Sequence, residues 1–193
     1  MRVTNVAEYI DYFRQIAVNN VFLQHNPASE MGSAPAESKH FARWSADEVL
    51  TGLRTKMSFP ALLVELYETD TEATDVNDVN GKYSGAFSIL QSALMENYTS
   101  EEAAYVLAEK IMLDVLRTIW NDHYGEEADR CEAPFEYFSF DKMNITPVGP
   151  IYNNQFGYRV LFGFRMSDNK KFTMLPATSA ADGFPYTLPI TFK

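Results

Sequence analysis

Cysteine is almost absent from this chain, which has one, Cys131, among 193 residues. A single thiol cannot form a disulfide within the chain, so a disulfide-stapled secreted scaffold is excluded and a reducing compartment fits. Cys131 lies in Asp129-Arg130-Cys131-Glu132, where two neighbouring acids disfavour the thiolate that a nucleophile needs. We therefore interpret Cys131 as a bystander thiol.

Glycine is also scarce, at 9 residues, and the glycines do not cluster as a phosphate-binding loop requires. Walker-type, Gly-x-Gly-x-x-Gly and Gly-x-Ser-x-Gly patterns do not occur in the sequence. No apolar run approaches the length that spans a bilayer, and the first residues lack the apolar core of a signal peptide. We therefore expect a cytoplasmic protein with no bound cofactor and no membrane contact.

Positively charged residues are fewer than negatively charged ones. The chain has 16 Lys and Arg against 26 Asp and Glu, which gives a formal net charge of −10. Such a surface repels phosphate groups, so gripping a nucleic acid and docking on an anionic membrane are both disfavoured.

Three histidines, His25, His40 and His123, are the remaining candidates for metal or acid–base chemistry. None has a second His, Cys or carboxylate at the spacing of metal ligands. His123 near the end of a predicted helix is accounted for by the helix dipole, which favours a cation there. The sequence therefore predicts no metal site and no catalytic residue.

Aromatic and apolar residues, by contrast, are plentiful. The chain is 46% hydrophobic and has 14 Phe and 11 Tyr, which favours a packed body with a large sheet. A length of 193 residues suits one domain, residues 1–193.

Two segments have helical periodicity. The first opens at a capping box, Asn5 with Glu8, and ends near Asn19-Asn20. The second opens at Thr99 with Glu102, runs to about His123, and stops at Gly125. Its apolar stripe is predicted to be Ala103, Leu107, Ile111, Val115 and Ile119.

Several other segments have the patterns of strands. Residues 59–67 form an apolar run, and Tyr83, Phe87 and Ile89 share one face of a second strand. We expect the two to form a hairpin with an acidic loop, residues 68–80, and a turn at Asn80-Gly81. Further strands are predicted at 21–23, 135–140 and 145–151, and the clearest period-two alternation is Tyr158 to Met166.

Two segments interrupt this order. Residues from about 25 to 58 form an insertion, predicted to be a loop followed by a short helix opened by Ser45 with Glu48. Residues 176–193 form an extended, proline-containing tail. This tail either packs on its own domain or contacts a neighbouring subunit through Phe184, Tyr186, Leu188 and Ile190. Together the patterns predict an α+β fold, a mostly antiparallel sheet packed against a long helix and an N-terminal helix.

The acidic loop contains five carboxylates, Glu68, Asp70, Glu72, Asp75 and Asp78. Their number suggests a calcium site, but the spacing fails the EF-hand pattern, which needs a central Gly and a closing Glu. A solvated hairpin tip is the ordinary interpretation. The alternative is an acidic surface that faces a channel or a partner.

This order of elements resembles the tail-terminator family of tailed bacteriophages and phage-like contractile devices. The similarity covers 59–67, with its Phe59-Pro60-Ala61-Leu62 start, 83–90, 100–122 and 143–166. The insertion and the C-terminal tail depart from the family pattern.

The resemblance implies a ring, typically of six subunits, that caps the tail tube and joins it to the head-side connector. The partners would be copies of the chain itself, tail-tube proteins and connector proteins, with DNA only passing through. The protein would be in the bacterial cytoplasm during assembly and in the virion or phage-like particle afterwards. An acidic lining would let DNA slide past without sticking.

Two alternatives stay open. One is a non-enzymatic module of a bacterial accessory system that binds a protein or a small ligand. The other is an enzyme of unfamiliar type, in which folding brings a histidine to Glu65 or Asp141, carboxylates that lie in or beside apolar strand segments.

Overall fold

The computed structural model describes residues 2–30, 32–33, 35, 38–44, 57–75, 78–125, 133–151 and 154–166. The described part contains two long helices, a short 3-10 helix and six strands. In chain order they are α1 (Val6–Asn19), the short 3-10 helix η1 (Pro27–Ser29), β1 (Phe41–Trp44), β2 (Ala61–Glu65), β3 (Glu68–Asp75), β4 (Asp78–Ser92), α3 (Tyr98–Tyr124), β5 (Tyr137–Ile151) and β6 (Gln155–Arg165).

The strands form one mixed sheet in the order β1-β2-β4-β6-β5, and β3 pairs with the first half of β4. Only β1 and β2 run parallel among these pairs. The predicted α+β fold is confirmed.

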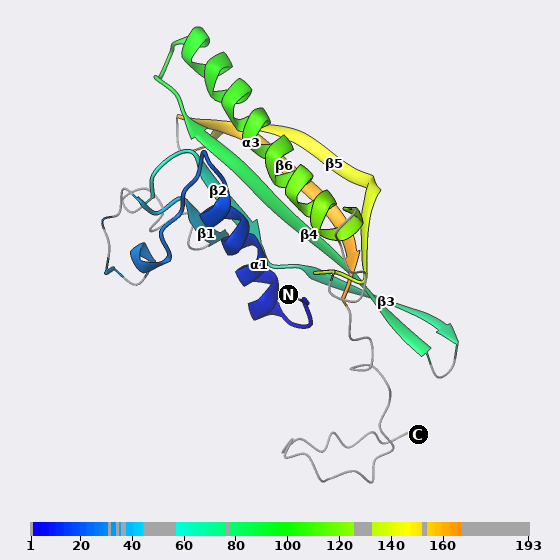
Figure 1. The fold of residues 1–193 in the computed structure, drawn as a ribbon. Coiled ribbons are helices and arrows are strands. Elements are labelled where there is room, and N and C mark those ends of the chain that lie inside the picture. The colour runs from blue at the N-terminus through cyan, green and yellow to red at the C-terminus, as the bar shows by residue number, and fades with distance from the viewer. Residues whose placement is uncertain are drawn as a thin grey trace, which may run out of the picture.

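Both helices cover the same face of the sheet, with α1 beside β1 and β2 and α3 crossing over β4 and β6 (Figure 1). The core lies between the helices and this face. Tyr83, Phe87 and Ile89 of β4 contribute to it, as do Val160, Phe162 and Phe164 of β6. Burying each large apolar side chain contributes roughly 1.5–3 kcal/mol. The predicted period-two faces of both strands are therefore confirmed.

Helix α1 begins where its cap predicts. The side-chain oxygen of Asn5 accepts hydrogen bonds from the amides of Ala7 and Glu8, at 2.9 and 3.0 Å. Glu8 reaches back to Thr4 instead of Asn5 and accepts from both the amide and the hydroxyl of Thr4.

The prediction of a short strand at residues 21–23 is wrong. Asn20 Oδ1 accepts from the amides of residues 22 and 23, which holds them in a turn.

Helix α3 begins two residues earlier than predicted, and its cap is Asn97, which accepts from the amide of Ser100 at 3.0 Å. The predicted stripe is correct at Ile111, Val115 and Ile119, which are buried, but Ala103 is exposed. Residues four apart on a helix are separated by about 400°, which is about 40° more than a full turn. A row of such residues therefore rotates by about 40° per step and leaves the buried face after several turns. Ala104 and Ala108 occupy that face near the start of the helix.

The insertion is more ordered than a loop. It contains η1 and strand β1, which adds to the edge of the sheet with Phe41 opposite Leu62. Its predicted short helix at Ser45, together with Cys131 and the tail from 176 to 193, lies outside the described residues.

The predicted strands at 135–140 and 145–151 form one strand, β5, with a bulge. Ser139 pairs with Gly163 and Asn144 pairs with Leu161, so four residues of β5 face a single residue of β6. A bulge bends a strand and redirects its side chains.

Candidate functional site

The predicted acidic loop is an extension of the sheet, which corrects the sequence analysis. Strands β3 and β4 pair from Glu68 opposite Ser84 to Asp75 opposite Asp78, and Gly81 lies within the ladder opposite Thr71. The predicted turn at Asn80-Gly81 is therefore wrong. Threonine alternates with acids from Glu68 to Glu72, and this period-two pattern of a strand-favouring residue could have revealed the strand.

This hairpin projects from the body as an arm (Figure 1). Strand β4 pairs with β6 only from Tyr83 onward, so its first residues, 78–82, pair with β3 alone in the described part of the chain. At about 3.4 Å per residue, the arm extends roughly 17 Å beyond that point. We use the name acidic arm for β3 and residues 78–81. It carries all five predicted site residues, Glu68, Asp70, Glu72, Asp75 and Asp78, and no Lys or Arg.

Repulsion between acids disfavours the pairing of the isolated arm. Asp75 and Asp78 are cross-strand partners, and like charges in that position destabilise a sheet. A two-stranded ribbon is also at best marginally stable on its own in water. Contact with a cationic surface would therefore stabilise it.

A basic groove of about 560 Å³ lies at the root of the arm. Its lining residues Lys82, Leu161 and Gly163 alternate along their strands with residues that face the core. The groove therefore lies on the face of the sheet that points away from α1 and α3. We use the name basic groove for this hollow. Its polar lining consists of Lys82, Ser84, Tyr137, Ser139, Lys142 and Arg165.

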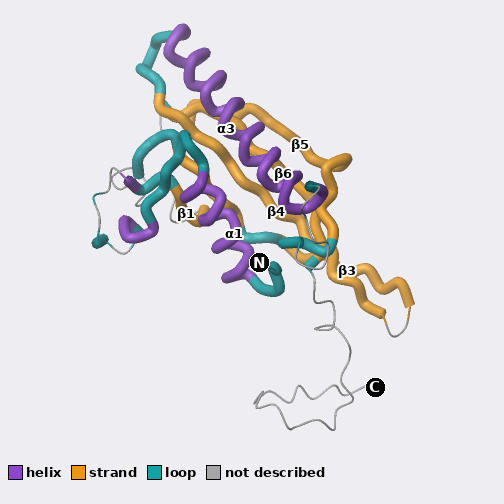
Figure 2. The backbone as a smooth tube through the Cα atoms, viewed as in Figure 1, coloured by secondary structure: helices purple, strands orange, loops and turns teal. Residues whose placement is uncertain are grey.

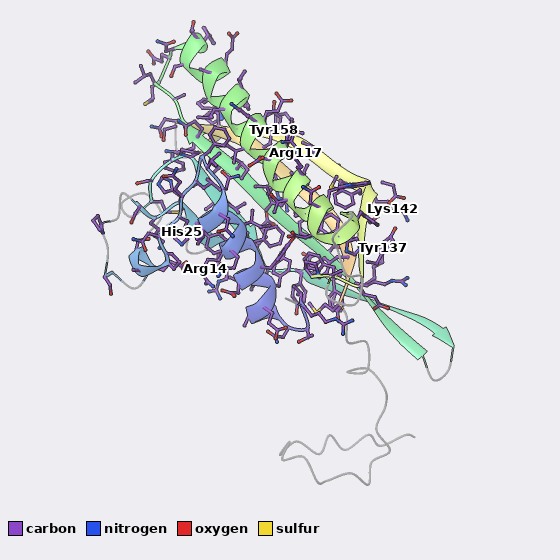
Figure 3. The ribbon with its side chains drawn as sticks, viewed as in Figure 1. Arg14, His25, Arg117, Tyr137, Lys142 and Tyr158 are labelled. Carbon is purple, nitrogen blue, oxygen red and sulfur yellow. The ribbon has the colours of Figure 1, made fainter. Side chains whose placement is uncertain are left out.

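The β5 bulge and the end of β6 bring the cations together. Figure 3 shows Tyr137 and Lys142 on β5, at the end of the sheet from which the arm leaves. Lys142 lies in the bulge, and Arg165 pairs with Tyr137 at the end of β6. Within the described part of the chain, Lys82, Lys142 and Arg165 have no ion-pair partner. The groove thus gathers three cations on a chain with a formal charge of −10, with Asp141 beside Lys142 and Asp70 opposite Lys82 in the ladder.

The two carboxylates of the enzyme alternative, Glu65 and Asp141, have other hydrogen-bond partners. Glu65 accepts two hydrogen bonds from Arg159, at 2.6 and 2.7 Å, which raise the pKa of Arg159. Asp141 accepts from the hydroxyl of Ser139 at 2.8 Å, and this bond lowers the pKa of Asp141. Among the described residues, the hydrogen-bond partners of these carboxylates are Arg159 and Ser139 and not a histidine.

His25 has a structural partner instead. Its Nε2 lies 2.8 Å from Oε1 of Glu30, which also accepts from Arg14 at 2.8 Å, and the amide of His40 donates to Nδ1. Burial lowers the pKa of His25 despite the bond to Glu30. The neutral Nε2–H tautomer satisfies both contacts, so His25 fastens the insertion to α1. Figure 3 shows Arg14 on α1 and His25 on the segment that follows it.

Sequence analysis missed an apolar stripe on the outer side of α3. Val106, Leu113 and Trp120 recur every seven residues and remain about half exposed or more, at 66%, 50% and 49%. The seven-residue spacing was available as a signal, but it was hidden by the longer apolar stripe that faces the sheet. Figure 2 shows this helix as the outermost layer of the body.

Other classes of site have no support in the described residues. They contain no group of three or more His, Cys, Asp or Glu side chains placed to hold a metal ion. The helices among them are too short or too polar to cross a membrane. The proposed contact residues of the tail, Phe184, Tyr186, Leu188 and Ile190, lie outside the described part.

A scan against protein-family models and a search of curated proteins found no match to this chain.

Proposed function

We propose that this chain is a structural assembly subunit that forms a ring with copies of itself, in the manner of a phage tail terminator. In this role the ring caps a tail tube and joins it to the head-side connector. The observation that carries the proposal is the acidic arm, a long ribbon that leaves the body and that self-repulsion destabilises when it stands alone.

The architecture supports the proposal. The order of a helix, a strand, a long hairpin, a long helix and a final hairpin is the order expected for the tail-terminator family. Both described helices lie on one face of the sheet, the basic groove lies on the face away from them, and the arm leaves the body at one end. A subunit with different surfaces at its two ends suits head-to-tail contacts, which close into a ring when the rotation between copies allows it.

The charge of the chain supports passage of DNA. A ring of subunits that each carry a formal charge of −10 would have a large negative charge, which disfavours tight binding of phosphate groups. DNA would then move through the ring without being held.

Electron microscopy of tailed particles assembled in cells that carry the gene tests this function. An epitope tag on the chain should be found at one position, the junction of tube and head. Deleting the gene should give tubes that are not joined to heads. Particles that lack the tagged chain, or that form normally without the gene, would contradict the proposal.

One observation favours a second candidate, a module that binds a small anionic ligand. The basic groove has a volume within the range of small-molecule sites, and its three cations have no ion-pair partner among the described residues. Calorimetric titration with inorganic phosphate and citrate tests it. Binding at micromolar concentrations that Arg165→Glu abolishes would favour this candidate, and heat only from dilution would dismiss it.

A further inference from the structure

We infer that the acidic arm of one copy docks in the basic groove of the neighbouring copy. This inference rests on the proposed function and names the contact that would build the ring. It commits the carboxylates towards the end of the arm, Glu72, Asp75 and Asp78, to a partner subunit, whereas Asp70 is opposite Lys82 of its own chain.

Charge complementarity is the first argument. The arm has five carboxylates and no Lys or Arg, whereas the groove gathers Lys82, Lys142 and Arg165 without an ion-pair partner among the described residues. A groove lined by three cations complements the charge of an acidic ribbon. Complementary charges raise the association rate and fix the register of an interface.

Geometry decides between a contact within the chain and one between copies. Lys82 lies at the root of the arm, and the ladder from Asp70 opposite Lys82 to Asp75 opposite Asp78 carries the arm away from the groove. The end of the arm can return to its own groove only if that ladder breaks. A second copy can bring its arm to the groove with both ladders intact.

The other groove residues suit carboxylate partners. The side chain of Tyr137 is 45% exposed and its hydroxyl can donate to a carboxylate, and Arg165 offers a planar fork of donors. The contact joins two different surfaces. Each copy therefore has one arm that can bind a neighbour and one groove that can accept the arm of another neighbour. Such a heterologous contact propagates from copy to copy and ends only by closing.

Two charge-reversed variants test the contact. The groove variant is Lys142→Glu/Arg165→Glu, and the arm variant is Glu72→Lys/Asp75→Lys/Asp78→Lys. Each variant alone places like charges at the contact, so neither should self-assemble. In an equimolar mixture every arm meets a groove of opposite charge, because the reversed arm fits the reversed groove and the native arm fits the native groove. The mixture also controls for folding, since misfolded variants could not restore assembly.

Sedimentation velocity of the full chain at about 0.05 M and about 0.5 M salt supplies the measurement. These concentrations lie below and above the roughly 0.1 M at which the Debye length is about 10 Å. We expect each variant alone to raise the dissociation constant at least about tenfold, and the mixture to restore it to within about threefold of the wild type. A matched control, Lys110→Glu/Arg117→Glu on the exposed side of α3, changes the net charge as much as the groove variant does and should assemble as the wild type does.

Two outcomes overturn the inference. The first is a wild-type chain that stays monomeric at low salt at every concentration. The second is a groove variant that assembles normally. If that variant also loses binding to a fluorescent DNA oligonucleotide, the groove is assigned to nucleic acid. The function itself fails separately, if the tagged chain is missing from particles while the arm still docks in the groove.

Discussion

Gly157 and Gly163 lie six residues apart on β6, yet their surroundings differ. A Cβ atom at Gly157 would collide with the backbone carbonyl of Ile89 on the neighbouring strand, whereas at Gly163 the first neighbour is Cβ of Ser139 at 3.8 Å. We therefore expect Gly157→Ala to lower the free energy of unfolding by roughly 2–3 kcal/mol, because backbone must move. Gly163→Ala should be neutral or stabilise the fold by up to about 1 kcal/mol, since alanine suits a strand better than glycine.

Urea unfolding of both variants measures the difference. The two substitutions are chemically identical, so Gly163→Ala is the matched control. Equal stability of the two variants would show that the close approach of β6 to β4 at Gly157 is not a constraint.

The buried histidine at the insertion predicts a pH dependence. Burial lowers the pKa of His25 below its usual value of 6.5. Below about pH 6.5 the unfolded chain therefore binds a proton that the folded chain does not, so stability falls as the pH falls. Glu30 acts in a separate, more acidic window. Burial alone would raise its pKa, but hydrogen bonds from Arg14 and His25 lower it from 4.5, so its contribution is lost only below about pH 4.5.

His25→Gln isolates this effect. Gln keeps an N–H donor for Glu30 but does not titrate, so the variant should lose less stability than the wild type between pH 7.5 and pH 5.5. The other two histidines are present in both proteins. Parallel losses in the two proteins would contradict the assignment.

At the scale of elements, α3 has two contrasting faces. Ile111 is fully buried against the sheet, and Leu113 is 50% exposed on the outer stripe. Ile111→Ala should lower the free energy of unfolding by about 2–5 kcal/mol because it leaves a cavity. Leu113→Ala should change it by no more than about 0.5 kcal/mol.

Chemical denaturation with circular dichroism checks this pair, and Leu113→Ala is the control for loss of helix propensity and volume. A large loss at Leu113 in the monomer would mean that the outer stripe packs against part of the same chain.

The elements that the sequence predicted well are those fixed by local rules. Asn5 caps α1 and Gly125 ends α3, and the alternation from Tyr158 to Met166 needs no knowledge of partners. The cap at Asn97 was missed because Thr99 with Glu102 offered the same spacing two residues later.

The candidate site was less predictable, since it depends on pairing. The acidic arm was predicted to be a loop because its repeated acids are typical of loops, although threonines alternate with them. Pairing with β4 makes the segment a strand despite that composition. The basic groove could not be predicted at all. Its cations come from β4, from a bulge in β5 and from the end of β6, and only the register of the sheet brings them together.

For the whole molecule, salt should control assembly. Contacts between exposed charges weaken as the Debye length falls from about 10 Å at 0.1 M salt to about 3 Å at 1 M. We expect the apparent mass of the wild-type chain to decrease as salt is raised, while circular dichroism of the fold stays unchanged. Light scattering measures the mass, and an assembly that persists unchanged at 1 M salt would indicate an apolar interface.

Native mass spectrometry of the wild-type chain at low ionic strength tests the central claim most directly. Head-to-tail contacts that close predict one dominant oligomer with a fixed number of copies, together with free monomer. A spectrum with monomer alone at every concentration, or an open-ended series of masses, would contradict a closed ring.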